Sequence, residues 1–418
     1  MKTRKIIIRS FITLLCIFLA LEIILRLFFV KPSKHCYGVF NKLELAPCNM
    51  KYYDKNVKAA GDVIQIDHDM LFGVSVDGID ITIADIVGAF KEDRKCGYAY
   101  ERNFTSVNNW WQSNNVGARY RRDVSSEIPQ GYKRILVFGE SFTHCRGVPQ
   151  EETWPHFMEQ GLERTEVLNF GVNGYSMTQS YLRFQQVISE IDYDTALFVF
   201  LPMDFVREVN IARCLRKWIG CRPVPRHILQ DNELVLIESL YPDMNSFYQE
   251  NDKRFSDRFR NYLNKYDRYY SHEKYEGRKV LGRSVLYKVL AAIYYEGKIA
   301  RLNLRFIDPD SEAFQIISKL FNKVNDEAKM NGKDFILTFL PDKNNVQDYK
   351  SNKRYNQQWN KMVSEMCGSG LKCLDLMTVF KDLPETSFDR SYDGTHFGKK
   401  TNKIIADEIK RFIEKAQQ

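Results

Sequence analysis

The chain has 418 residues, of which 44% are hydrophobic and 27% are charged, and its formal net charge is +8 at neutral pH. This length and composition indicate an ordinary globular protein with one substantial core and some additions. No recognised nucleic-acid motif accompanies the positive charge, so we expect no nucleic-acid partner. Tyrosines interleave with Lys and Arg in residues 253–283, where the alternatives are a surface for acidic glycans or lipid headgroups and a solvated helix face.

The N-terminus is predicted to be an uncleaved membrane anchor. An apolar stretch covers residues 6–30. That is long enough to span a bilayer, which takes about 20 residues, whereas the apolar part of a cleaved signal has about 7–15 and ends in small residues. The end of this stretch, residues 27–30, is bulky instead. Glu22 and Arg26 interrupt the stretch four residues apart, so they are expected to pair on one helix face.

Basic residues on either side of the anchor predict its orientation. Four precede the apolar core and two follow it, and this excess predicts a cytoplasmic N-terminus with the rest of the chain outside the cytosol, in the periplasm or an equivalent space. The six residues are Lys2, Arg4, Lys5, Arg9, Lys31 and Lys34. Cys16 follows Leu15 rather than a small residue, so lipid attachment there is not expected.

Eight of the nine cysteines follow the anchor and would meet an oxidising compartment. Eight cysteines permit 105 connectivities, and local pairing is the simplest of them. For Cys145 the alternatives are a free thiol, a bond to Cys96 and simple burial. The local pairs we expect are Cys36 with Cys48, Cys214 with Cys221, and Cys367 with Cys373.

Five short apolar runs predict the strands of a sheet. The first, residues 134–138, is rich in β-branched and large apolar side chains and stops at Gly139. Helix-like segments separate the runs, and this alternation implies parallel strands with right-handed crossovers, so the predicted fold class is α/β. The second run starts at Val167, and the third covers 196–205, with its strand ending at Asp204. The fourth and fifth runs cover 335–340 and 371–376. Helices are expected near 284–294, at 310–331 and at 399–416.

Ser141 lies just past the tip of the first predicted strand. Open α/β sheets bind ligands beyond the carboxyl ends of their strands, so a serine there can meet a substrate, although a serine in this position can also simply cap a helix. A serine hydroxyl needs a base to become a nucleophile, and a neutral imidazole suits that task. His396 is the candidate base, with Asp393 three residues earlier to orient it. The alternative for Asp393-Gly-Thr-His396 is a plain turn.

Three blocks in order resemble the SGNH, or GDSL-type, hydrolases. They are Gly139-Glu140-Ser141, the run from Asn169 to Gly174, and Asp393-Gly-Thr-His396. The resemblance extends from about Asn114 to the C-terminal helix. It implies a flavodoxin-like three-layer α/β/α sandwich with a five-stranded parallel sheet. It also implies that Ser141, Asp393 and His396 are catalytic and that the Ser141 and Gly174 amides bind the oxyanion.

Two positions depart from the family pattern. Glu140 replaces the usual Asp, a mild change because the carboxylate is kept on a longer side chain, and Met203 stands where these hydrolases place an oxyanion-binding Asn. A thioether has no N–H to donate, so Asn173 is the expected substitute. The loss of one such donor typically costs about 10²–10³ in rate. His144, three residues past Ser141, can either reach the site or turn to the rim or a carbonyl. No metal or cofactor is expected, since the histidines form no ligand spacing and the glycines form no phosphate loop.

The expected organisation is a cytosolic tail and transmembrane anchor (residues 1–31), an extension packed beside the core (32–130), and an SGNH-like domain (131–418) with an insertion at about 206–282. The expected function is that of an exported, membrane-anchored serine esterase or acyltransferase acting on acyl esters, chiefly O-acetyl esters, of envelope glycans. Two alternatives stay open. They are a catalytically weak or inactive glycan-binding or assembly component, motivated by Met203, and a lipid-directed esterase.

Overall fold

The computed structural model describes residues 2–32, 37–39, 43–45, 74–76, 79–81, 90–106, 109–216, 223–251, 255–272, 284–305, 307–368 and 370–416. The chain divides into two compact units. We call Met1–Lys55, Ala212–Cys221 and Tyr248–Leu304 the anchor unit. Asn56–Ile211, Arg222–Phe247 and Arg305–Gln418 form the sheet unit.

The sheet unit is built on five parallel strands, as predicted. Their order is β14 (Lys372–Asp375), β13 (Asp334–Phe339), β10 (Thr195–Phe200), β8 (Lys133–Phe138) and β9 (Thr165–Asn169). The interior of β8, β10 and β13 is an almost unbroken apolar run that is buried along its length. Such runs are typical of strands covered by helices on both faces.

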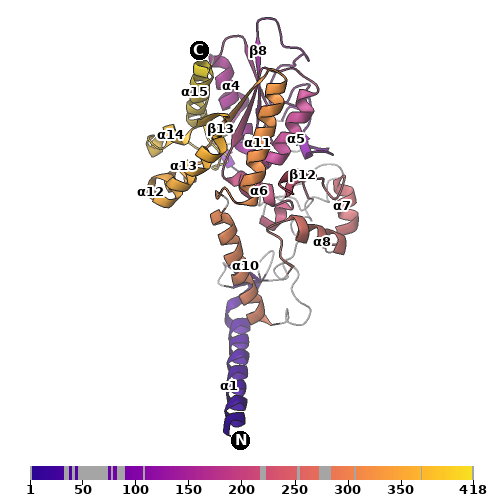
Figure 1. Cartoon of the computed structure of the whole chain (residues 1–418), viewed down its shortest axis with the longest axis vertical. Coiled ribbons are helices and arrows are strands. Elements are labelled where there is room, and N and C mark those ends of the chain that lie inside the picture. Colours follow the sequence, from indigo (N-terminus) through magenta and orange to yellow (C-terminus); the bar gives the residue numbers. More distant parts are fainter. Residues whose placement is uncertain are drawn as a thin grey trace. The chain divides into compact units, whose positions relative to one another are not determined.

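Helices form the two outer layers (Figure 1). On one face α4 (Trp154–Gly161) packs against α15 (Lys399–Ala416), and on the other α11 (Glu312–Met330) packs with α5 (Met177–Ile188) and α6 (Met203–Val209). This confirms the α/β three-layer fold. The remaining elements of the unit are β4 (Val74–Val76), β5 (Ile79–Ile81), β6 (Phe90–Asp93), β7 (Gly97–Tyr100), α3 (Ser141–His144), η4 (Gln150–Glu152), β11 (Arg226–Gln230), β12 (Glu233–Ile237), α12 (Lys343–Ser351), α13 (Lys353–Cys367), α14 (Met377–Phe380) and η7 (Glu385–Ser387).

One predicted strand end was wrong. The run from residue 196 was expected to stay extended to Asp204, but β10 ends at Phe200 and α6 begins at Met203. Pro202 precedes the helix in the helical backbone conformation, which suits proline at a helix start. The Asp204 carboxylate then accepts a hydrogen bond from the Leu201 N–H at 2.9 Å, so Asp204 belongs to the first helical turn rather than to a strand tip.

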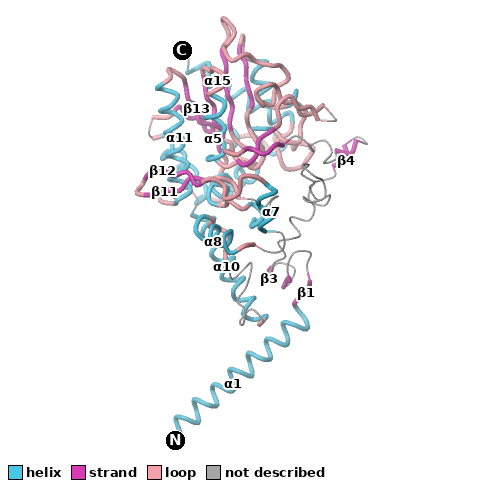
Figure 2. Tube along the Cα trace, turned by 90° about the vertical axis from the view of Figure 1, so that its right-hand side faces the viewer, coloured by secondary structure: helices cyan, strands magenta, loops and turns pink. Residues whose placement is uncertain are grey.

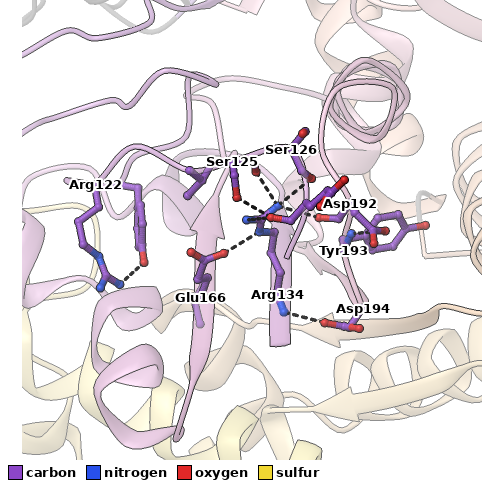
Figure 3. Close-up of polar contacts among 12 residues, drawn as sticks. Arg122, Ser125, Ser126, Arg134, Glu166, Asp192, Tyr193 and Asp194 are labelled. Carbon is purple, nitrogen blue, oxygen red and sulfur yellow. Dashed lines mark hydrogen bonds and ion pairs between the residues drawn. The ribbon is translucent and has the colours of Figure 1, made fainter. Parts of the chain in front are cut away.

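A buried arginine ties together the amino end of the sheet, away from the end that carries Ser141. Figure 3 shows the Arg134 guanidinium between Glu166 and the carbonyl groups of Ser125 and Ser126. Arg134 is 0% exposed, and its Nε lies 2.7 Å from the Glu166 carboxylate. A buried guanidinium is tolerated only with charge and hydrogen-bond partners of this kind, so this end of the sheet is built for stability.

Part of the predicted N-terminal extension contributes to the core of the sheet unit. The β6–β7 hairpin and the following loop bring apolar side chains against the segment after β9. The buried members of this cluster are Cys96, Tyr100, Trp111, Val172, Tyr175 and Leu182. The hairpin therefore packs on the segment that carries Gly174.

The anchor unit begins with a long apolar helix, α1 (Lys2–Ile24), followed by one π-helical turn (Leu25–Phe29) (Figure 2). Within the described residues, Arg9–Leu27 is the one helical segment long and apolar enough to cross a membrane. Arg26 and Glu22 pair at 2.8 Å, as predicted. The other elements of the unit are β1 (Val30–Pro32), β2 (Tyr37–Val39), β3 (Leu43–Leu45), η5 (Arg213–Arg216), α7 (Met244–Asn251), which starts in the sheet unit, α8 (Asp257–Tyr266) and α10 (Val285–Arg305).

The cysteines confirm one predicted disulfide. Cys367 and Cys373 are bonded, and the bond joins the end of α13 to β14. Cys96 and Cys145 are both free thiols and both buried, so the bond between them is the alternative that the structure excludes. The predicted pairs that involve Cys36, Cys48 and Cys221 lie outside the described residues.

Candidate functional site

Ser141 is the first residue of the short helix α3, directly after β8 and a Gly-Glu turn. Glu140 caps this helix, because its carboxylate accepts a hydrogen bond from the Phe142 N–H at 2.8 Å. The cap makes the chain turn sharply at the carboxyl end of β8, which lies between β10 and the edge strand β9. Ser141 is 6% exposed, so its hydroxyl faces a nearly closed environment.

The structure brings Ser141, His396 and Asp393 together. His396 Nε2 lies 2.8 Å from Ser141 Oγ although the two residues are 255 positions apart. On the other side of the ring, His396 Nδ1 lies 2.7 Å from Asp393 Oδ2. The Phe142 ring packs against the imidazole at 4.6 Å between centroids and limits its tilt. This is the geometry in which an imidazole can take a proton from a serine.

Asp393 is held in a turn that fixes both of its oxygens. Its Oδ1 accepts hydrogen bonds from the Ser391 hydroxyl and from the N–H groups of Thr395 and His396, at 2.6, 2.9 and 3.0 Å. Burial alone raises the pKa of the Asp393 carboxyl, but the hydrogen bonds and charge of His396, with the Ser391 hydroxyl, bring it below its ordinary value. Asp393 is therefore an anion that faces the imidazole through Oδ2.

A glycine makes room for this turn. Gly147 has a φ of +85°, and a Cβ built on it would lie 2.8 Å from Ser391 Oγ and 2.9 Å from the Asp393 carboxyl carbon. The Gly147 carbonyl also accepts a hydrogen bond from the Tyr392 N–H at 3.0 Å. A residue with a side chain would push the Asp393 turn away from the nucleophile loop.

A buried charge cluster lies behind Ser141. Arg207 Nη1 is 2.9 Å from Glu140 Oε2 and 3.2 Å from Asp204 Oδ1, and all three side chains are at most 8% exposed. Burial alone raises the pKa of Glu140, but the charge and hydrogen bond of Arg207 hold it below its ordinary value. Burial, together with the Glu140 charge, raises the pKa of Asp204. One cation therefore balances mainly the carboxylate that touches the serine.

Ser141 Oγ has two partners that compete for its hydrogen. Glu140 Oε2 lies 2.7 Å from it and His396 Nε2 lies 2.8 Å from it. A hydroxyl supplies one hydrogen. Ser141 can therefore donate to Glu140 while His396 Nε2 carries its own hydrogen, and must donate to His396 when Nε2 is the base. In the reactive arrangement His396 therefore takes the Ser141 hydrogen in competition with Glu140.

We expect Glu140→Gln to lower the free energy of unfolding by about 3 kcal/mol, because it leaves the buried Arg207 guanidinium without the carboxylate that chiefly balances its charge. The measurement is urea-induced unfolding followed by circular dichroism, with Glu190→Gln as control, since Glu190 makes an exposed ion pair with Arg102. A free energy of unfolding equal to that of the parent protein would mean that Asp204 balances the Arg207 charge instead.

The predicted oxyanion donors follow β8 and β9, Ser141 at the start of α3 and Gly174 in the loop before α5. Within the described residues, neither the Ser141 nor the Gly174 backbone N–H donates to a protein acceptor. Gly174 has a φ of +78°, and a Cβ there would lie 3.0 Å from the Tyr98 hydroxyl. That hydroxyl donates to the Asn173 carbonyl at 2.9 Å and so fixes the loop. Glycine is required here by both the backbone and the close approach of Tyr98.

Asn173 and Met203 differ in whether their side chains carry an N–H group that could bind an oxyanion. The Asn173 Oδ1 is buried with no hydrogen-bond partner in the described part of the chain, and the same amide carries two N–H groups that can donate. Met203 is 38% exposed and offers no N–H. Asn173 is therefore the side chain of the two that can act as a donor.

His144 is a packed core side chain. It is 2% exposed, stacks on Tyr100 at 4.4 Å and meets Trp111 edge-on at 4.8 Å. Burial lowers the pKa of His144 well below its ordinary value, so the ring is neutral. The structure thus places it between aromatic rings rather than against Ser141.

Several contributors to the site were not found from the sequence, among them Gly147, Ser391, Arg207, Arg119 and Tyr98. Arg207 carried a weak signal, because it lies three residues after Asp204 on one helix face. Arg119 is buried and donates to the carbonyls of Cys145 and Val148 at 3.0 and 2.6 Å, which fixes the loop after α3. Neither Arg119 nor Tyr98 carries a local sequence signal, since both act through contacts made only in the folded chain.

In the described ranges, no group of three or more His, Cys, Asp and Glu residues is placed to hold a metal ion. The polar groups around Ser141 pair with one another, as an imidazole with a carboxylate and a guanidinium with two carboxylates.

The fold and the site define an α/β domain with a serine, an imidazole and a carboxylate in line at the carboxyl end of β8. The sequence matches no protein-family model and no curated protein. Three of the solved structures to which the chain is similar are enzymes named for ester chemistry. They are Axe2, an acetylxylan esterase from Geobacillus stearothermophilus (12% identity, 68% of this chain and 95% of that chain, TM-score 0.35), a lipase/acylhydrolase from Enterococcus faecalis (14%, 68% and 96%, 0.32) and a GDSL-like lipase from Bacteroides thetaiotaomicron (13%, 68% and 89%, 0.27).

Proposed function

We propose that this protein is a serine esterase or acyltransferase of the SGNH type that acts on acyl esters, with O-acetyl esters of envelope glycans as its substrates. The observation that carries the proposal is the continuous contact from Ser141 Oγ to His396 Nε2 at 2.8 Å and from His396 Nδ1 to Asp393 Oδ2 at 2.7 Å. These residue types in this order are those that make a serine nucleophilic at neutral pH.

In the proposed reaction Ser141 Oγ attacks the ester carbonyl and its proton passes to His396 Nε2. Asp393 holds the Nδ1–H and stabilises the imidazolium that forms. The Ser141 and Gly174 amides, assisted by Asn173, bind the developing oxyanion. Collapse of the intermediate returns the proton from His396 to the leaving alcohol and leaves an acyl group on Ser141.

The second half of the reaction decides between hydrolysis and transfer. Water or a sugar hydroxyl gives its proton to His396 and attacks the acyl-Ser141 carbonyl. The bond from the acyl carbon to Ser141 Oγ then breaks, and His396 returns the proton to Ser141 Oγ. The two outcomes use the same residues and differ only in the acceptor. We assign both to this site, and the acceptor is identified by experiment.

We place the reaction outside the cytosol, with α1 as the anchor. Support comes from the basic residues before α1, from the length of its apolar segment, and from the Cys367–Cys373 disulfide, which suits an oxidising compartment. Such a location brings the site to envelope polymers that carry acyl esters.

The test is to trap the acyl group. We expect full-length protein in detergent to turn over p-nitrophenyl acetate and, after rapid acid quenching, to carry an added mass of about 42 Da on the peptide that contains Ser141. A fluorophosphonate probe should label the same residue. Repeating the trapping with envelope extracts then names the native acyl group, and added sugar acceptors separate transfer from hydrolysis.

The alternative of a glycan-binding component rests on Met203, which is exposed where the family places a donor. It predicts no turnover and no probe labelling despite a folded protein that still binds envelope glycans. That combination would replace the enzyme proposal. Labelling of a residue other than Ser141 would overturn the assignment of the nucleophile.

A further inference from the structure

The helix α10 of the anchor unit has one packed face. Val285, Ala292, Tyr295 and Ile299 recur at helical spacing and are all buried. The Tyr295 hydroxyl also donates to the Tyr269 carbonyl at 2.7 Å. This side of the helix is therefore anchored to its own unit.

The opposite face of the first three turns is apolar and open. Leu290 is 58% exposed, Ile293 is 55% exposed and Tyr294 is 76% exposed. With Leu286 they fall in one sector, about half a turn from the packed face, because residues advance about 100° along a helix. Water does not stabilise such a continuous apolar face, so a partner is expected to cover it.

The start of α10 is bonded to the apolar helix α1. The Glu22 carboxylate accepts hydrogen bonds from the Ser284 hydroxyl and from the N–H groups of Val285 and Leu286, at 2.9, 2.7 and 2.9 Å. Glu22 lies five residues before the end of the segment Arg9–Leu27, which is about 7–8 Å along the helix. The first turn of α10 therefore lies beside the apolar segment of α1 and not beyond its end.

The composition of α10 changes from apolar to charged along its length, starting from the end that is bonded to α1. Lys288 is the single charged residue between Val285 and Tyr295. All other charges follow, and tyrosines stand at the change, as is common where a helix passes through a membrane interface. The later charged residues are Glu296, Lys298, Arg301 and Arg305, and the tyrosines are Tyr287, Tyr294 and Tyr295.

We infer that the open face of α10 around Leu290, Ile293 and Tyr294 is a membrane-contact surface that enters the lipid leaflet beside α1. The inference rests on α1 crossing a membrane, as in the proposed function. Glu22 then has a structural purpose inside the apolar segment, because it satisfies backbone N–H groups of a second helix where water is scarce and is itself paired with Arg26.

A lipid partner fits this surface better than a second copy or another protein. A protein partner does not require the apolar residues to be confined to the end of α10 that is bonded to α1. A leaflet does, since the hydrocarbon ends a short distance beyond Glu22 and the charged half of the helix must lie outside it.

The test uses the full-length protein in vesicles of phosphatidylcholine and phosphatidylglycerol, with the photocrosslinking residue benzoylphenylalanine placed singly at chosen sites. Leu290 and Ile293 are the test positions. Leu14 on α1 is the reference for lipid contact, and Arg301, on the same α10 face but in its charged half, is the matched control. All four are exposed, so the replacement fits without repacking.

We expect lipid adducts at Leu290 and Ile293 at a yield within about twofold of that at Leu14 and roughly fivefold above that at Arg301. Lipid adducts at Leu14 without any at Leu290 and Ile293 would overturn this inference alone. Protein adducts at the two test positions would assign the face to a protein partner instead. No lipid adduct at Leu14 would overturn the membrane anchor and this inference together, while leaving the proposed chemistry at Ser141 intact.

Discussion

Replacing Ser141 by Ala is expected to lower kcat/KM for p-nitrophenyl acetate by about 10⁴–10⁶-fold, because it removes the atom that becomes acylated and leaves only binding and oxyanion stabilisation. The fold should persist, since the hydrogen-bond partners of Ser141 Oγ among the described residues are Glu140 and His396 and a methyl group fits in its place. Steady-state rates and the midpoint of thermal unfolding check the two parts separately.

A control variant at a second serine tests whether the loss of activity is specific to Ser141. Ser189→Ala removes a hydroxyl that bonds the Gln186 carbonyl at the exposed end of α5, and its kcat/KM should stay that of the parent protein. If Ser141→Ala retained more than about a tenth of the parent rate, a different nucleophile or a water attack would be required. Fluorophosphonate labelling that survives in Ser141→Ala would lead to the same conclusion.

The fold and the principal site residues were predictable because their signals are local. Five apolar runs predicted the strands, and the short blocks around Ser141, Gly174 and His396 each lie next to a predicted element. Ser141 follows β8, Gly174 lies between β9 and α5, and His396 lies three residues before α15. The end of β10 was the exception. An apolar run that continues into Leu201 and Met203 cannot show where extension stops, and only the helical backbone at Pro202 ends the strand.

The charge balance of the site could not be predicted, because it depends on contacts between distant segments. Glu140 looked like a mild replacement of Asp, yet its longer side chain reaches both the Ser141 hydroxyl and Arg207. The same holds for Glu22, whose pairing with Arg26 follows from their spacing, whereas its bonds to residues 284–286 join segments more than 260 positions apart.

Asp393→Asn is the second variant with a large expected effect, a fall in kcat/KM of about 10⁴-fold. The cause is the tautomer of His396. Three donors, the Ser391 hydroxyl and two backbone N–H groups, fix an acceptor at the Oδ1 position. The amide nitrogen of Asn must then take the Oδ2 position and point its hydrogens at His396 Nδ1. That places the imidazole hydrogen on Nε2, which can no longer accept the Ser141 proton.

The same variant changes how stability depends on acid. Because the pKa of Asp393 in the folded chain is below its ordinary value, the carboxylate contributes stability that is fully present above its unfolded pKa of about 4 and is lost as the pH falls further. Asp393→Asn should remove this share, so the midpoint of thermal unfolding should fall less between pH 6 and pH 3 than in the parent protein. Asp326→Asn, on the exposed side of α11, should keep the parent slope. An Asp393→Asn protein with this flatter acid response but a parent-like kcat/KM would make Asp393 a structural residue and leave His396 without a required orienting group.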